Sequence, residues 1–402
     1  MGDDANIASS AQESQSTPTP GRTDAPEEPA ILSEEGSAAL GADFPPDWLL
    51  PPGRILQAEL DARDLTQAEL AARTNLSTKH VNQVIKGAAS LTFDMALRLE
   101  RTLGTPAGFW NRLEANHQDQ RAREKAREEL SRNLGWLRRF PLPALIERNI
   151  LSTDDSDVTT LERLLQFFQV ADIEAYERTW AEPVAAGFRR AQHTNVDAYA
   201  TAAWLRLGER LAEQNPCDPY DPVAFAQLLP NLRRLTLLPD QEALTVLRRE
   251  CATVGVAVVY EPELPGCRAC GATRWITPSK ALILLSGRYR YHDIFWFTFF
   301  HEAAHLILHP KRRIFVDLEA KGDDVDGHEK AANDYAASTL IPDEYADRLT
   351  QHTTARRAAE LADELGIARG IVAGRLSHLQ NNWTRYLRLR RKLDSITPTS
   401  AS

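Results

Sequence analysis

The sequence predicts a multidomain, mainly α-helical protein, with an all-α N-terminal domain, a helical middle region and a C-terminal α+β domain. Its 402 residues exceed the size of one ordinary domain. Apolar residues recur at helical spacing over most of the chain, beginning with Leu56, Leu60 and Leu70. Two short aliphatic runs, residues 253–261 and 281–286, lie between glycines and prolines and predict strands.

The composition is typical of a protein that folds in water. Hydrophobic residues make up 43% and charged residues 26% of the chain, and no apolar run approaches the roughly 18 to 20 residues of a membrane helix. No basic segment followed by an apolar one suggests export. The four cysteines are too few for a disulfide framework, and Cys267-x-x-Cys270 lacks the second pair of a zinc ribbon. We therefore expect a cytoplasmic protein without membrane contact.

The negative charge is concentrated at the N-terminus. Residues 1–43 contain nine acidic side chains and one basic one, which is nearly the whole of the net charge of −9. This segment is rich in Ser, Thr, Pro and Gly and cannot bury enough apolar surface to offset the entropy of ordering. We predict a disordered acidic tail over 1–43. The remaining chain is close to neutral, so the overall charge does not exclude a nucleic-acid partner.

The first ordered domain is predicted at residues 44–116, and the stretch 65–87 has the layout of a helix-turn-helix. Thr66 can cap the first helix, and Glu69, three residues later, completes a capping box. After a short turn, Ser77 can cap a second helix whose apolar positions face back onto the first. This arrangement is typical of a DNA-binding module.

The exposed face of the second helix is polar. No Asp or Glu occurs between Leu70 and Phe93, whereas basic residues do. A surface without acids suits a polyanion, and polar side chains on such a helix reach base edges or phosphates. The predicted contacts to double-stranded DNA are Thr78, Lys79, Asn82, Gln83 and Lys86. The alternative is a small helical bundle with a solvated face.

Charge and periodicity divide the rest of the chain. Residues 117–140 alternate in charge and predict an exposed helical linker, and residues 141–250 predict a helical middle region. The C-terminal domain is expected over 251–392, where the segment between the two predicted strands, 265–280, is interpreted as a loop or hairpin. Residues 393–402 are predicted to be a second disordered tail.

The stretch 299–310, FFHEAAHLILHP, contains the pattern H-E-x-x-H at His301, Glu302 and His305. On a helix, residues four apart share one face, so the two imidazoles can bind one metal ion, and Glu302 can reach a water at the open coordination position. The neighbouring residues are apolar, which predicts a buried helix whose polar groups need a partner, and Pro310 ends it. These features favour a catalytic Zn²⁺ site with Glu302 as the base.

A catalytic zinc ion usually has three protein ligands, so a third is required. His309 follows the first histidine of the motif by eight residues, about 12 Å along a helix, and is excluded on that ground. A later predicted helix supplies Glu329, our choice, with His328 and Asp334 as alternatives. Asn333, one turn after Glu329, is expected to hold that carboxylate in place.

Three segments of residues 51–116 carry a resemblance to a known family: QAELAART, VNQVIKG and ALRLERTLGTPAGFWNRLEAN. They resemble the Cro/C1-type helix-turn-helix (XRE family) of HigA-like antitoxins. The resemblance implies a homodimer that binds an operator, usually repressing its own operon. It also admits a toxin as a partner.

Two further segments, SKALILLSGRYRYHDIFWFTFFHEAAHLILH and EKAANDYAASTLIP, lie within residues 254–342. They resemble the ImmA/IrrE family of metallopeptidases. The resemblance implies a zincin-like fold, zinc-dependent cleavage of peptide bonds and a Cro/C1-type repressor as substrate. Tyr335 stands where many relatives have Phe.

Two hypotheses of function follow. The first is a DNA-binding transcriptional regulator with a zinc-dependent endopeptidase domain, which cleaves a Cro/C1-type repressor or its own N-terminal domain. The alternative is a HigA-like antitoxin or repressor whose peptidase-fold domain is a non-catalytic sensor or partner-binding module. The intact H-E-x-x-H pattern favours the first.

Overall fold

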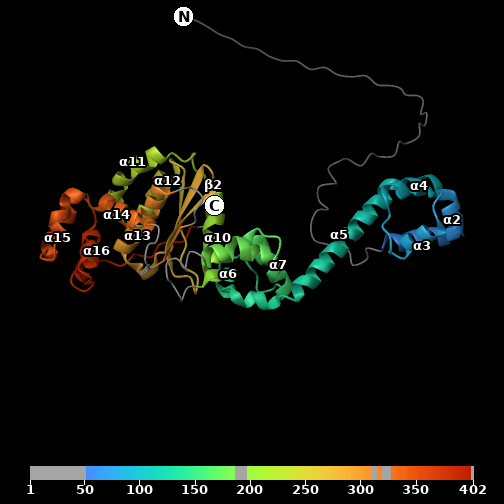
Figure 1. The fold of residues 1–402 in the computed structure, drawn as a ribbon, viewed down its shortest axis with the longest axis horizontal. Coiled ribbons are helices and arrows are strands. Elements are labelled where there is room, and N and C mark those ends of the chain that lie inside the picture. Colours follow the sequence, from blue (N-terminus) through green and yellow to red (C-terminus); the bar gives the residue numbers. More distant parts are fainter. Residues whose placement is uncertain (1–50, 186–196, 310–314, 319–326, 400–402) are drawn as a thin grey trace, which may run out of the picture. The chain divides into compact units, whose positions relative to one another are not determined.

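The structure is a computed structural model that describes residues 51–185, 197–309, 315–318 and 327–399. The acidic tail predicted at the N-terminus lies outside the described residues. Figure 1 shows a mainly helical chain with a small sheet in its C-terminal part, which confirms the predicted fold class. Across these ranges, no helix has both the length and the apolar character needed to cross a bilayer. Contacts divide the chain into two compact units that meet between Asp119 and Gln120.

The N-terminal unit is a helical bundle around one core. Its helices are α1 (Pro52–Ala62), α2 (Gln67–Thr74), α3 (Thr78–Ile85), α4 (Phe93–Leu103) and the first turns of α5 (Ala107–Ser131). Every helix contributes fully buried side chains, among them Leu60, Leu70, Val81, Leu99 and Trp110. The bundle is therefore held by apolar contacts between segments that are close in sequence.

The local chemistry of the helix-turn-helix is as predicted. The Thr66 hydroxyl accepts a hydrogen bond from the Glu69 N–H at 3.1 Å, and the Glu69 carboxylate accepts one from the Thr66 N–H at 2.8 Å. Asn75 ends α2 in the left-handed conformation, with φ of 53°, which an asparagine tolerates. Ser77 caps α3, because its hydroxyl accepts a hydrogen bond from the His80 N–H at 3.1 Å. These caps fix the turn between the two helices.

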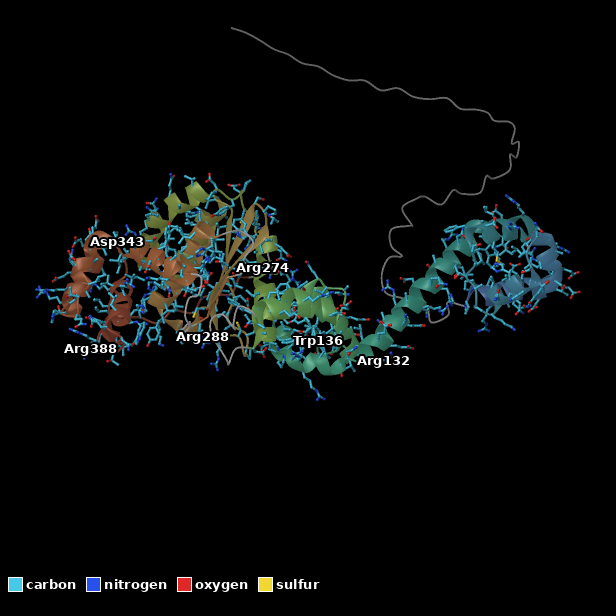
Figure 2. The ribbon with its side chains drawn as sticks, in the orientation of Figure 1. Arg132, Trp136, Arg274, Arg288, Asp343 and Arg388 are labelled. Carbon is cyan, nitrogen blue, oxygen red and sulfur yellow. The ribbon has the colours of Figure 1, made fainter. Side chains whose placement is uncertain are left out.

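The predicted helical middle region is confirmed. Its helices are α6 (Leu142–Glu147), α7 (Asp157–Phe168), α8 (Ile173–Tyr176), α10 (Ala198–Gln214), α11 (Pro222–Leu232) and α12 (Asp240–Ala252). The expected exposed linker differs at its C-terminal end. Trp136, labelled in Figure 2, Leu137 and Phe140 are buried in the same core as α7 and α10. The apolar residues of this short stretch therefore belong to the C-terminal unit.

The sheet has four strands in the order β1-β3-β2-β4. They are β1 (Val256–Tyr260), β2 (Ala269–Thr277), β3 (Lys280–Leu285) and β4 (Phe315–Leu318). β1 pairs with β3 in parallel, and β2 is antiparallel to both β3 and β4. Of the two interpretations of residues 265–280, the structure has the hairpin, because β2 turns directly into β3. β4 was not predicted, because residues 315–318 have no pattern that distinguishes a strand.

Helices cover both faces of the sheet. On β1, Ala257 and Val259 face the core that includes α7 and α10, whereas Val256 and Val258 face a second core. The second core contains residues of α11 and α12 and of the later helices. These are α13 (His292–Leu308), α14 (His328–Leu340), α15 (Ala355–Leu365) and α16 (Arg369–Leu379). Burial on both faces explains why β1 and β3 are continuous apolar runs.

The prediction of disorder at the C-terminus is wrong for residues 393–399. Leu393 and Ile396 are each only 8% exposed and belong to the second core. The Asp394 N–H donates to the Asp240 carboxylate at 2.8 Å. A short polar segment has no periodicity that would predict such a position, because its partners lie far away in the sequence.

Candidate functional site

Three ionisable side chains from two helices come together in the C-terminal unit. α13 carries His301 and His305 one turn apart, with their Nε2 atoms separated by 3.0 Å. Glu329, in the first turn of α14, places Oε2 at 3.2 Å from His301 Nε2 and Oε1 at 3.6 Å from His305 Nε2. Candidate ligand atoms of the three residues lie within 4.8 Å of one another. In the part of the chain that the structure describes, no other such group of His, Cys, Asp or Glu was found.

The packing of α13 and α14 explains why these residues meet. α13 is apolar on nearly every side and lies in the core, with Phe299 and Phe300 fully buried. α14 packs against α13 and buries Ala332 and Ala336 completely. Small side chains allow two helices to approach closely, which brings the first turn of α14 within reach of the two histidines.

Burial sets the protonation of this group. It lowers the pKa of His305 to about 4, an effect that the hydrogen bond with Glu329 opposes. For Glu329, burial favours the neutral acid, but hydrogen bonds with His301 and His305 outweigh it and hold the pKa below its ordinary value. At neutral pH the group therefore contains a neutral His305 and an ionised Glu329, which are the forms that bind metal ions.

The donor set fits Zn²⁺. Two imidazole nitrogens and one carboxylate oxygen are typical ligands of a catalytic zinc ion, and three of them leave one position open. His301 Nδ1 lies 3.1 Å from Asn333 Oδ1. An amide oxygen only accepts, so this contact places the proton on Nδ1 and leaves Nε2 with a lone pair for a metal. Asn333 thus contacts His301, whereas the sequence analysis expected it to hold Glu329.

The two alternative ligands, His328 and Asp334, are not part of the three-residue group. The rings of His328 and His309 stack with their centroids 4.2 Å apart, and His309 Nε2 donates to the His328 carbonyl at 3.2 Å. Asp334 lines a cavity of about 230 Å³ between α13, α14 and α16.

His309, which was excluded as a ligand because of its distance from His301, lies just beyond the end of α13. α13 ends at Leu308, and His309 is extended, with φ of −120° and ψ of 156°. Its ring centroid lies 5.1 Å from that of His305. His309 is not among the three grouped residues, which agrees with its exclusion as a ligand.

Glu302, the predicted base, is fully buried on the side of α13 that packs against β2. Its carboxylate Oε2 accepts a hydrogen bond from the Thr273 hydroxyl at 2.6 Å. Thr273 did not enter the predicted site, because no sequence pattern links a threonine on a strand to a helix that follows later in the chain.

The predicted DNA contacts differ in their access to solvent. Thr78, Lys79 and Lys86 are exposed on α3, and Asn82 and Gln83 are half-buried. The Asn82 amide also donates to the Gln67 side chain on α2 at 3.0 Å. The three exposed side chains therefore reach a ligand without rearrangement, whereas Asn82 must exchange a hydrogen bond.

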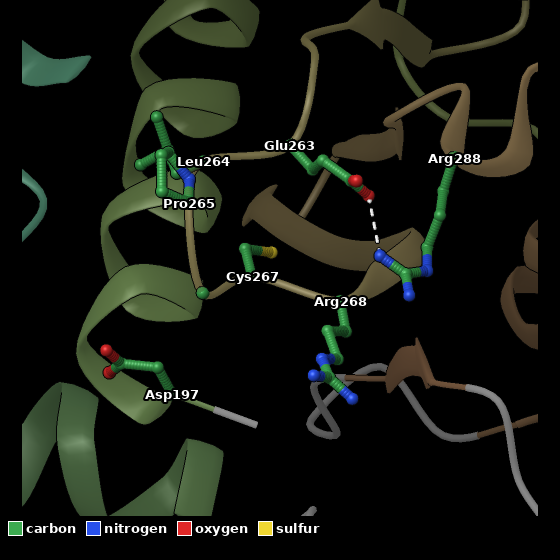
Figure 3. Close-up of a pocket in the computed structure, with 8 residues that line it drawn as sticks. Asp197, Glu263, Leu264, Pro265, Cys267, Arg268 and Arg288 are labelled. Atoms are coloured by element: carbon green, nitrogen blue, oxygen red, sulfur yellow. Dashed lines mark hydrogen bonds and ion pairs between the residues drawn. The ribbon is translucent and has the colours of Figure 1, made fainter. Parts of the chain in front are cut away.

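Another cavity, of about 460 Å³, is shown in Figure 3. It shares no residue with the group of His301, His305 and Glu329. Arg288 and Glu263 form an ion pair at 3.1 Å along its wall. Burial raises the pKa of the Cys267 thiol in this wall to about 11. Cys267 is therefore protonated at neutral pH, which does not suit a nucleophile or a metal ligand.

Two family models match separate parts of the chain. Residues 56–110 match the family described as Helix-turn-helix. Residues 278–377 match Peptidase_M78, described as an IrrE N-terminal-like domain. A comparison with curated proteins gives no match.

Several solved structures are similar to about a fifth of the chain. An addiction module antidote protein of the HigA family from Coxiella burnetii is 32% identical over 21% of this chain and 91% of that chain, with a TM-score of 0.20. Pseudomonas aeruginosa antitoxin HigA, solved with the higBA promoter, is 31% identical over 20% of this chain and 88% of that chain, with a TM-score of 0.19. PA4674 of Pseudomonas aeruginosa, solved with its operator DNA, is 34% identical over 18% and 81%, with a TM-score of 0.18. The chain thus carries one segment that matches a helix-turn-helix family and a second that matches Peptidase_M78, an IrrE N-terminal-like domain.

Proposed function

We propose that this protein is a DNA-binding regulator whose C-terminal domain is a zinc-dependent endopeptidase. The observation that carries the proposal is the grouping of His301, His305 and Glu329, with Glu302 on the same helix as the two histidines, within a segment that matches the Peptidase_M78 family. His301 and His305 are buried, and a buried imidazole needs a partner away from water. A metal ion would be such a partner.

In this mechanism His301, His305 and Glu329 would hold the zinc ion, which supplies Lewis acidity toward a water molecule and the scissile carbonyl. The Glu302 carboxylate would take a proton from the attacking water and deliver it to the leaving amine. Asn333 fixes the orientation of the His301 ring through Nδ1. Because Glu302 is fully buried, bulk water does not compete for its carboxylate.

The N-terminal unit would bring the protein to double-stranded operator DNA. Support comes from the match of residues 56–110 to the helix-turn-helix family and from the polar face of α3. Lys79 and Lys86 would contact phosphates, and Thr78 and Gln83 would reach base edges after docking. Operators of such proteins are commonly symmetric, so we expect a homodimer.

The substrate we favour is a protein of Cro/C1-type repressor fold, because this chain itself joins such a DNA-binding domain to a peptidase-family domain. The substrate is then either a separate repressor or the N-terminal unit of this chain, and we expect both in the cytoplasm. Incubation of the pure protein with zinc distinguishes the two. Self-cleavage should divide the chain within residues 117–140, whereas a separate substrate leaves a single intact band.

One observation favours a second candidate function. His301, His305 and Glu329 are also within hydrogen-bond distance of one another, so they could stabilise the fold without an ion. The domain would then be a non-catalytic sensor or partner-binding module of an antitoxin-like repressor, with a toxin as one partner.

The change Glu302→Gln separates the two candidates, because it keeps the shape of the side chain and removes the base. Cells that produce wild-type or Glu302→Gln protein are compared by mass spectrometry. The proposal predicts at least one protein that is fragmented with the wild type and accumulates intact with Glu302→Gln. Identical protein fragments in both, together with an unchanged regulatory phenotype, would support the sensor.

A further inference from the structure

The strand β2 lies against the helix that carries Glu302. β2 is bonded on both sides, since Thr273 pairs with Ile283 of β3 and with Phe315 of β4. Gly271 and Thr273 are two residues apart on this strand, so they face the same side of the sheet. That side is covered by α13, and both residues meet Glu302 there.

Thr273 is bonded to the carboxylate of Glu302. Its Oγ1 lies 2.6 Å from Glu302 Oε2 and 3.0 Å from the Glu302 backbone carbonyl. Thr273 is 2% exposed and Glu302 is fully buried, so the contact is shielded from water. A hydroxyl has one proton, and the carboxylate oxygen is the nearer of the two acceptors. The hydrogen bond therefore goes to Oε2.

Gly271 provides the space that the same carboxylate occupies. A Cβ atom at this position would lie 2.7 Å from Glu302 Oε1 and 2.6 Å from Thr298 Cγ2. Both distances are shorter than any ordinary contact, so a side chain here would displace Glu302 or the helix. One carboxylate oxygen is thus held by Thr273, and the other rests against the backbone of Gly271.

We propose that Thr273 and Gly271 are positioning residues for the general base, a role that rests on the proposed peptidase function. Glu302 has several rotatable bonds, and without a partner its carboxylate could turn among several rotamers. The contacts with Thr273 and Gly271 limit the Glu302 carboxylate to one rotamer. A base in a fixed place contributes to turnover because small displacements of a reacting group slow the reaction strongly. The effect belongs to the chemical step, so kcat changes and KM does not.

The first test uses the metal-free protein and does not depend on activity. Thr273→Val preserves the shape of the side chain and removes the donor. It should lower the melting temperature by about 4 °C, as expected for a buried hydrogen bond to a charged group in a domain of this size. In the Glu302→Ala background the same change should cost less than half as much. Equal losses in both backgrounds would overturn the proposal, because Thr273 would then act through the backbone carbonyl alone.

The second test measures turnover of the best-cleaved member of a fluorogenic peptide library by the zinc-loaded protein. Thr273→Val should lower kcat about tenfold at unchanged KM. Thr273→Ser, which keeps the hydroxyl, should retain most of the wild-type kcat. Gly271→Ala should have a lower kcat than Thr273→Val. Thr277→Val, on the exposed end of the same strand, is the matched control and should have no effect. Unchanged kcat in Thr273→Val would overturn the proposal. If the wild type cleaves no peptide, the peptidase proposal loses support, and the measurements on the metal-free protein still decide whether Thr273 holds Glu302.

Discussion

The polar face of α3 and the group of His301, His305 and Glu329 on α13 and α14 differ in exposure to solvent and in how their residues are brought together. On α3, Thr78, Lys79 and Lys86 are exposed and lie within nine residues of one another. In the other group, His301 and His305 have side chains that are 3% and 1% exposed, and the third member comes from a separate helix. Exposed polar groups are solvated, so they contribute free energy only when a ligand binds. Buried ones need partners within the fold.

This difference predicts different consequences of substitution. A change on α3 should alter DNA affinity and leave the fold intact, because surface side chains contribute little to stability. A change in the buried group should alter stability, its dependence on pH and metal binding together.

The buried His305 should make the stability of the fold depend on pH. The pKa of folded His305 is about 4 and its ordinary value is 6.5, so between these values the unfolded chain binds a proton that the folded chain does not. Stability therefore rises with pH across this window and is lost as the pH falls from 6.5 to 4. One side chain with this shift contributes about 3 kcal/mol to the change in the free energy of unfolding. Urea unfolding of the metal-free protein measures it, with α13 and α3 followed separately by hydrogen exchange.

The control for this effect is His305→Gln, which removes the titrating ring. Its α13 stability should change less between pH 7 and pH 4 than that of the wild type, and the stability of α3 should be the same in both proteins. Equal pH dependence of α13 in the two proteins would show that His305 is not neutral in the fold.

Removal of the Asn333 amide should weaken metal binding without abolishing it. Asn333→Leu keeps the approximate volume and removes the acceptor for His301 Nδ1, so the ring is free to change its tautomer and tilt. We expect zinc affinity to fall about 10- to 100-fold. Competition with a chromogenic chelator measures the affinity, and Ser338→Ala, on the same helix, is the control. Wild-type affinity in Asn333→Leu would contradict the assigned contact.

Lys86→Ala should produce the smallest effect and only on DNA. The loss of one phosphate contact should weaken binding by about 1 kcal/mol for all sequences and lower the salt dependence of the binding constant by about one unit. Fluorescence anisotropy with an operator duplex at several salt concentrations measures both quantities. Zinc content and α13 stability should not change. A change in sequence preference would instead place Lys86 against base edges.

The sequence predicts the helix-turn-helix better than the rest because its determinants are local. Thr66, Glu69 and Ser77 act on backbone groups a few residues away, so their spacing alone indicates the caps that the structure contains. The pairing of His301 with His305 is equally local, since it depends only on the repeat of a helix. An acidic residue on a later predicted helix then indicated Glu329.

The contacts that the sequence did not predict are between distant segments. The bond of Thr273 to Glu302 depends on how β2 lies beneath α13, and the strand itself has too many small and polar residues to show a clear alternation. Leu393 and Ile396 are buried because their segment packs against residues that come much earlier in the chain. In each case packing between elements decides the position, and periodicity carries no information about it.

The central claim is that His301, His305 and Glu329 bind one zinc ion. Metal analysis of the purified, dialysed protein tests it most directly, with His305→Ala as the variant and His309→Ala as the matched control on the same helix end. The account predicts about one zinc ion per chain in the wild type and in His309→Ala, and almost none in His305→Ala. A wild-type protein without zinc, or zinc retained in full by His305→Ala, would contradict it.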